Sequence, residues 1–181
     1  MKRIAALAAL LTLSAVTPAH ALGNLFLTSP LVEQNGTLPR SAAGNQDGCN
    51  GENISPTLDW SGAPEGTQSY ALTMFDPNAQ GGGKLHWIVT NIPVMPSTLP
   101  PDSGNPDKLP QGVNVIPNSF GTENYVGPCP PPGQVGSYEF TIYAMPEAQV
   151  FYSLSAVGPS TIQWLRERAL ETATLTVKYG R

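Results

Sequence analysis

The stretch Tyr138-Glu139-Phe140-Thr141-Ile142-Tyr143-Ala144 decides the fold class of this chain. Its residues alternate between two sets, which is typical of a β-strand because successive side chains of a strand point to opposite faces. One face carries Tyr138, Phe140, Ile142 and Ala144, and the other carries Glu139, Thr141 and Tyr143. The stretch therefore predicts a strand that turns its first set of side chains toward a core.

Further runs along the chain have the composition of strands, because they are rich in β-branched and aromatic residues and end at Gly, Pro, Asn or Ser. They cover residues 24–28, 58–60, 69–75, 87–92 and 173–179. The chain also has 18 glycines, 19 prolines and only 12% charged residues. This composition favours many short strands joined by tight loops over a helical bundle. We therefore expect a mainly β fold.

One short helix and two long loops complete the prediction. Ser160-Thr161-Ile162-Gln163 has the pattern of a capping box, with Ser160 as the N-cap, and we expect the helix to run to about Glu171. Residues 94–125 are rich in Pro, Asn, Asp, Ser and Gly, and Gly127-Pro128-Cys129-Pro130-Pro131-Pro132-Gly133 follows them. Loops as long as the first are usually functional or disordered.

The N-terminal residues have the pattern of a secretory signal. Lys2 and Arg3 precede an apolar run over residues 4–16, and Ala19-His20-Ala21 matches the small-x-small cleavage site. We predict that residues 1–21 are a cleaved signal peptide and that residues 22–181 form a single domain. A buried N-terminal helix is the alternative interpretation. The predicted location is the bacterial periplasm or the exterior.

The charge of the chain limits the classes of partner that we expect, and its two cysteines are candidates for a disulfide. The chain has a formal net charge of −4 and no cluster of Lys or Arg, so nucleic acid is not an expected partner. After the N-terminal apolar run, no further run is apolar enough to span a membrane. In an oxidising compartment the pair Cys49 and Cys129 favours a disulfide. Two buried free thiols are the alternative.

Asp76 and His86 are the candidate functional pair, because His86 is the only histidine after residue 21. Each lies at one end of a strand-like run, with glycines between them. If the fold brings them together, the carboxylate would hold one ring nitrogen and favour the protonated imidazole, whose other nitrogen would face a ligand. The alternatives without a binding role are a histidine buried in the core and a turn that begins at Asp76-Pro77. One histidine and two cysteines predict no metal site and no cofactor.

Four segments taken together resemble the phosphatidylethanolamine-binding protein (PEBP) family. They are residues 48–56, Asp76-Pro77-Asn78-Ala79, His86-Trp87-Ile88-Val89, and residues 125–133. Within the family they are most similar to the bacterial Raf-kinase-inhibitor-like branch, the YbhB/YbcL type. The resemblance covers about residues 25–179. It implies a PEBP-like sandwich of antiparallel sheets, with a small pocket near one end that binds phosphate or a phospholipid head group.

Carried over residue by residue, the resemblance implies a ligand-binding set of Asp76, Ala79, His86, Gly127, Pro131, Gly133 and Tyr138. The chain also departs from the family. Gly136-Ser137-Tyr138 stands where the family usually has His-Arg-Tyr, and Asn78 and Gln80 replace an acid and a proline. We therefore expect a pocket with less positive charge and more room, in which one lost hydrogen bond to a charged group weakens binding by about 1.5–3 kcal/mol.

Three functions follow from these residues. The first is an exported, non-catalytic binding protein for a small anionic ligand, either phosphate or a phospholipid head group. The second is an inhibitor or regulator of a protease-like or kinase-like protein target, acting through the pocket rim and the loop over residues 94–125. The third is a hydrolase using Asp76 and His86, with Ser137 as a conceivable nucleophile. We disfavour the hydrolase, because the chain has no Gly-x-Ser-x-Gly elbow and too few metal ligands.

Overall fold

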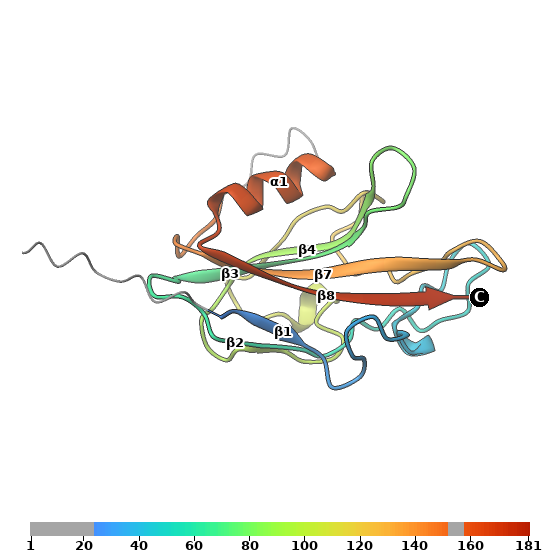
Figure 1. Cartoon of the computed structure of the whole chain (residues 1–181), viewed down its shortest axis with the longest axis horizontal. Helices are drawn as coiled ribbons and strands as arrows, with labels where there is room; N and C mark the ends of the chain where they lie inside the picture. Colours follow the sequence, from blue (N-terminus) through green and yellow to red (C-terminus); the bar gives the residue numbers. More distant parts are fainter. Residues whose placement is uncertain (1–23, 152–157) are drawn as a thin grey trace, which may run out of the picture.

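The computed structural model describes residues 24–151 and 158–181, so the predicted signal peptide over residues 1–21 lies outside the described residues. Two antiparallel sheets pack face to face (Figure 1). The larger sheet has the strand order β6-β4-β3-β7-β8, and the smaller has the order β1-β2-β5. Among the described residues there is one α-helix, α1, and it covers the outer face of the larger sheet. The expected mainly β, antiparallel sandwich with one short helix is confirmed.

The elements are β1 (Phe26–Thr28), β2 (Leu58–Ser61), β3 (Ser69–Asp76), β4 (Lys84–Ile92), β5 (Thr98–Leu99), β6 (Asn114–Val115), β7 (Val135–Met145), α1 (Pro159–Arg168) and β8 (Glu171–Gly180), with short 3₁₀ turns η1 (Arg40–Ala42) and η2 (Pro106–Lys108). Every predicted strand is present. Most of them are longer than expected, because pairing with a neighbour continues the strand into residues of weak β-propensity, such as the start of β7. Within the described residues, no helix is long and apolar enough to cross a bilayer.

Strand β7 confirms the predicted division into two faces. Tyr138, Phe140, Ile142 and Ala144 lie in the core between the sheets. The opposite face is partly exposed only at its start, since Thr141 and Tyr143 are also buried. Leu165 of α1 packs against Tyr143 from outside the sheet, and the Tyr143 hydroxyl lies 3.3 Å from Thr73 Oγ1. A strand that alternates in sequence is therefore covered on both faces over its second half.

The predicted helix boundaries are wrong by a few residues. The N-cap is Gly158 rather than Ser160, and Pro159 occupies the first turn, where its missing N–H and fixed φ are favourable. The Gly158 N–H donates to Thr161 Oγ1 over 3.3 Å. The helix ends at Arg168 rather than near Glu171, because Glu171 already pairs with Ala144 at the start of β8.

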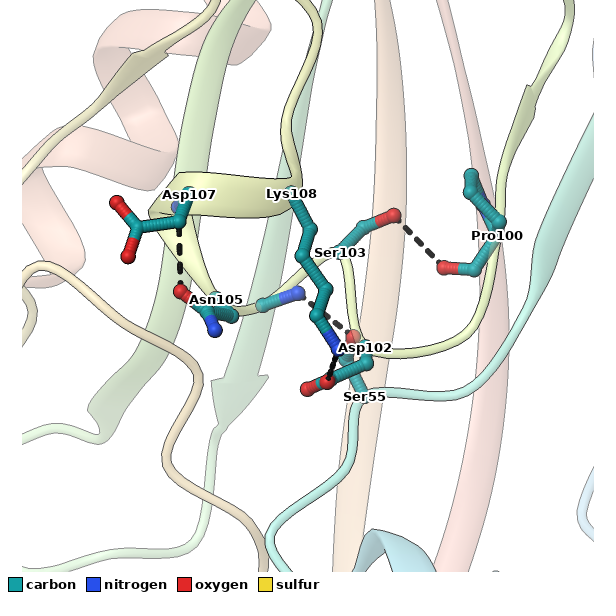
Figure 2. Close-up of polar contacts among 8 residues, drawn as sticks. Ser55, Pro100, Asp102, Ser103, Asn105, Asp107 and Lys108 are labelled. Carbon is teal, nitrogen blue, oxygen red and sulfur yellow. Dashed lines mark hydrogen bonds and ion pairs between the residues drawn. The ribbon is translucent and has the colours of Figure 1, made fainter.

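The segment over residues 94–125 is ordered by its own contacts, some of which Figure 2 shows. The Asp102 N–H donates to the Ser55 carbonyl over 3.0 Å. Lys108 forms an ion pair with the Asp102 carboxylate (Figure 2). Asn105 Oδ1 accepts the Asp107 N–H over 3.1 Å at the start of η2. Together with β5 and β6, these contacts pin the segment to the sandwich.

The outer edge of β8 is partly covered by the segment over residues 34–38. The Asn35 N–H donates to the Thr176 carbonyl over 2.7 Å, and the Leu38 N–H donates to the Lys178 carbonyl over 2.8 Å. Thr37 and Lys178 form a parallel bridge between these two hydrogen bonds. The C-terminal half of this edge strand therefore has its backbone groups paired.

Candidate functional site

A cavity of about 650 Å³ lies at the end of the sandwich where β8 finishes, on the side marked C in Figure 1. The β3–β4 hairpin, the start of β7, the Pro-rich loop and the segment before Cys49 surround it. Its lining includes six of the seven residues expected at the site: Asp76, Ala79, His86, Gly127, Pro131 and Tyr138. The seventh, Gly133, lines a neighbouring depression with Thr37 and Lys178 instead.

Sheet pairing brings Asp76 and His86 to this cavity. Asp76, the last residue of β3, pairs with Lys84, the first residue of β4, so His86 is two positions farther on the same face. The expected direct contact between the two side chains is wrong. Asp76 Oδ1 accepts the Asn78 N–H over 2.9 Å and so starts the turn that follows β3. Asp76 acts on the imidazole through its charge alone.

The partner of the imidazole is a backbone carbonyl. His86 Nδ1 lies 2.7 Å from the Val126 oxygen, and both residues are buried. A carbonyl can only accept, so Nδ1 carries the proton and the neutral ring leaves Nε2 as an acceptor. This contact fixes the tautomer that the sequence argument had assigned to Asp76.

Burial lowers the pKa of His86 below its ordinary value. The Val126 carbonyl and the charge of Asp76 oppose this effect by raising the pKa, and Lys84 adds to it by lowering the pKa. The imidazole is therefore neutral at pH 7. In the absence of a ligand, His86 therefore presents an acceptor nitrogen to the cavity at neutral pH, whereas we expected a protonated ring that donates from both nitrogens.

Two aromatic rings frame His86. The Tyr138 ring lies 5.4 Å from the imidazole and the Phe120 ring 5.1 Å from it, both edge to face. Lys84 Nζ lies over the Phe120 ring at 5.4 Å. Burial, followed by the charge of Asp76, raises the pKa of Tyr138 to about 12. Tyr138 therefore remains a neutral phenol with a hydroxyl that can donate.

Gly136 does not enlarge the cavity as the sequence argument expected. A Cβ at this position would lie 2.5 Å from the Tyr138 hydroxyl oxygen and 2.8 Å from two carbons of its ring. The Tyr138 ring thus lies in the space that a side chain at position 136 would need. With Tyr138 in this position, a side chain at position 136 would require the ring to move.

The glycine amides expected to line the cavity have partners within the protein. The Gly127 N–H donates to Asn53 Oδ1 over 2.7 Å, and the Gly133 N–H donates to the Arg181 carbonyl over 2.6 Å. A Cβ at Gly127 would lie 2.3 Å from the Ala42 carbonyl oxygen. Glycine is needed at 127 for close packing of two backbones, and these two N–H groups are not available to a ligand.

The predicted disulfide is confirmed. Cys49 and Cys129 are bonded, with their Cα atoms 5.9 Å apart. Cys129 lines the cavity, and so do Gln46 and Asp47 from the other side of the bond. Arg181 Nε adds a hydrogen bond of 2.8 Å to the Pro130 carbonyl. The disulfide therefore joins two wall segments that are far apart in sequence.

The charges around the cavity are mixed. Within the described ranges, Lys84 is the only lysine or arginine in the lining, while Asp47 and Asp76 contribute carboxylates. The part of the chain that the structure describes holds no group of three or more His, Cys, Asp or Glu placed for a metal ion. Sequence reasoning overlooked Lys84, although its spacing of two from His86 puts both on one face of β4. Phe120 has no such signal.

Comparisons with known proteins agree with this architecture. Residues 28–180 match the family model described as phosphatidylethanolamine-binding protein. UPF0098 protein YbcL of Escherichia coli is 40% identical over 136 residues, covering 73% of this chain and 74% of YbcL. UPF0098 protein YbhB of the same organism is 33% identical over 145 residues, covering 79% of this chain and 92% of YbhB.

Two further similarities concern structure and location. The crystal structure of E. coli YbcL superposes with a TM-score of 0.80 and 36% identity, covering 87% of this chain and 98% of YbcL. A Mycobacterium tuberculosis protein whose name describes it as a lipoprotein, LppC, is 39% identical over 140 residues. That similarity covers 76% of this chain and 63% of LppC, so the chain spans less than two thirds of that relative.

Proposed function

The chain belongs to the phosphatidylethanolamine-binding protein family, and from this we propose that it is an exported, non-catalytic binding protein for a small anion such as phosphate or a phospholipid head group. The observation that carries the proposal is the convergence of His86, Tyr138 and Lys84 on one cavity. Tyr138 offers a hydroxyl donor and Lys84 offers a positive charge. His86 supplies a third polar group whose tautomer is already fixed by Val126.

Binding fits this arrangement better than catalysis. The hydrolase considered above would use Asp76 and His86 as an acid–base pair, and Asp76 instead accepts the Asn78 N–H. Ser137 follows Gly136 and precedes Tyr138 in β7, so it projects from the opposite face of the strand and is not part of the cavity lining. The described residues that line the cavity therefore include no serine, threonine or free cysteine that could act as a nucleophile beside the imidazole.

Export to the periplasm or the exterior is supported from three directions. The disulfide Cys49–Cys129 is of a kind that persists in oxidising compartments. The N-terminal residues have the pattern of a signal peptide. LppC, a relative with 39% identity, is named as a lipoprotein.

Isothermal titration calorimetry with inorganic phosphate tests the proposed binding. We expect saturable binding to the native protein at pH 5.5, strongly reduced by His86→Gln and reduced by Tyr138→Phe. Ser137→Ala is the matched control, because Ser137 lies beside Tyr138 on the other face of β7 and should leave the affinity unchanged. Absence of saturable binding to the native protein at any pH would contradict the proposal.

A protein target is the second candidate, and exposed apolar residues at the cavity rim favour it. Val135 is 70% exposed and Phe120 is 38% exposed. Phe120 belongs to the segment over residues 94–125 that the sequence argument proposed as a contact surface. Because that segment contains β5 and β6, its deletion would disturb the fold. The double substitution Phe120→Ser and Val135→Ser is the better test, and capture of a protein equally well by this variant would contradict the idea.

A further inference from the structure

The cavity offers His86 to a ligand as an acceptor. Nδ1 is occupied by the Val126 carbonyl, and within the described residues Nε2 has no hydrogen-bond partner. His86 lines the cavity, so Nε2 is the polar atom that its ring presents there. An oxyanion also consists of acceptors, and two lone pairs cannot form a hydrogen bond with each other. A proton between Nε2 and the anion resolves this conflict.

We propose that the cavity binds an oxyanion together with one proton, held between His86 Nε2 and a ligand oxygen, and that it therefore prefers a phosphomonoester to a phosphodiester. This rests on the proposed function, because it concerns the same site. A monoester in its singly charged form has a P–OH group that can donate to Nε2. A diester has the same charge and no acidic hydrogen, so it binds only when the imidazole itself is protonated.

The surrounding groups leave His86 as the group that accepts this proton. Asp76 of β3 and Lys84 of β4 act on the imidazole through their charges, and the ring of Tyr138 of β7 packs against it. The segments that close the cavity contribute the uncharged Phe120 ring, the Val126 carbonyl and the Asp47 carboxylate. Tyr138 stays a neutral phenol, and burial disfavours an imidazolium unless an anion compensates its charge.

The source of the proton sets the pH dependence. A phosphomonoester has a second pKa of about 6, and above it the dianion must take up a proton on binding. A diester requires the protonated imidazole, whose pKa is lowered by burial. At pH 6 and above, the monoester should therefore bind more tightly than the diester. The difference in affinity should be about tenfold for each unit by which the pKa of His86 lies below 6. In acid, where His86 is protonated, the two esters should bind alike.

Methyl phosphate and dimethyl phosphate are the probes for a titration between pH 4.5 and 7.5. Calorimetry in two buffers of different ionisation enthalpy measures the protons taken up on binding. We expect uptake near one proton for both probes at pH 7.5, and uptake near zero for methyl phosphate between the pKa of His86 and pH 6. ¹⁵N-labelled histidine gives a direct readout, because His86 is the only histidine beyond residue 21. Its Nε2 signal should change to the protonated form when dimethyl phosphate binds.

Two variants distinguish the effect of the proton on ligand preference from the effect of the shape of the cavity. His86→Gln should abolish the pH dependence of the preference for the monoester. Phe120→Leu alters the packing against the same ring without adding or removing a titrating group, so the preference should keep its pH dependence. If His86→Gln does not fold, the comparison of the two probes on the native protein and on Phe120→Leu decides the question by itself.

Vesicles distinguish an intact phospholipid from a soluble ester, since the phosphate of phosphatidylethanolamine is a diester. The affinity for phosphatidylethanolamine vesicles should fall progressively as the pH rises above the pKa of His86, whereas the affinity for methyl phosphate should stay constant up to about pH 6. Equal affinity for both probes at every pH, or binding without proton uptake at pH 7.5, would overturn the inference and leave the proposed function standing. Binding of neither probe nor vesicle at any pH would overturn both.

Discussion

The ring of Tyr138 lies over the backbone of Gly136, so close that a Cβ at position 136 would meet the Tyr138 hydroxyl oxygen at 2.5 Å. The two residues are i and i+2 on one strand and share the face that turns toward the cavity. The position of the phenol hydroxyl therefore depends on the absence of a side chain two residues earlier. This dependence gives the first prediction.

Gly136→Ala should displace the Tyr138 ring, which is buried and packs in the core between the sheets. We expect a loss of stability of about 1–3 kcal/mol, the usual effect of overpacking, and weaker phosphate binding. Urea unfolding and calorimetry measure the two effects. In a Tyr138→Leu background the same substitution should have a smaller effect on stability. Effects that are equal in the two backgrounds would show that the ring and the glycine are not coupled.

The folding stability should decrease as the pH falls below about 6.5, because the unfolded imidazole has its ordinary pKa there and takes up a proton before the folded, buried imidazole does. The loss ends once the pH falls below the lowered pKa of folded His86. Its slope cannot exceed about 1.4 kcal/mol per pH unit from this one group. Urea unfolding between pH 4.5 and 7.5 checks this, and His86→Gln should remove that part of the slope. An identical pH dependence in both proteins would contradict the prediction.

The pKa of His86 should respond with opposite signs to two neighbouring charges. Asp76→Asn should lower it further, because the carboxylate favours the imidazolium, while an amide oxygen can still accept the Asn78 N–H. Lys84→Gln should raise it, because the ammonium disfavours the imidazolium. NMR titration of the His86 ring measures both shifts. Asp47→Asn is the control, since Asp47 lines the same cavity but does not contribute to the pKa of His86. Shifts of the same sign in the first two variants would refute the electrostatic account.

Removal of the disulfide by Cys49→Ser and Cys129→Ser together should cost up to about 4 kcal/mol of stability, given a closed loop of 80 residues. Phosphate affinity should fall as well, because the bond joins the segment of Gln46 and Asp47 to the Pro-rich wall. A reducing agent should reproduce both effects in the native protein and have none on the double variant. Unchanged affinity after reduction would show that other contacts, such as Arg181 with Pro130, hold the wall in place.

Sequence reasoning located the strands because the alternation of side chains carries that signal, and the family resemblance indicated most of the residues that line the cavity. The alternation in β7 identified its core face, and the segments around Asp76 and His86 marked two sides of the cavity. The partner of His86 Nδ1 escaped prediction, because a carbonyl such as that of Val126 belongs to the backbone and has no signature in the sequence. The same holds for the Gly127 amide, whose acceptor, Asn53, lies 74 positions away.

Other differences arise from tertiary contacts. The helix starts beside Pro159 because proline suits the first turn, and it ends early because β8 begins at Glu171. Phe120 reaches His86 through the fold of a segment with no periodic pattern, so its place at the cavity could not be inferred from spacing. Lys84 could have been found, because it lies two residues before His86 in β4 and therefore on the same face of the strand.

The covered edge of β8 bears on how the protein behaves at high concentration. An unpaired edge strand is a template for intermolecular sheet formation and amyloid-like growth. Asn35 and Leu38 occupy the backbone groups of Thr176 and Lys178 that a second molecule would need. Proteolytic cleavage near residue 34, or any other change that detached the segment over residues 34–38, would leave this edge of β8 unpaired. The exposed strand could then act as a seed for polymerisation.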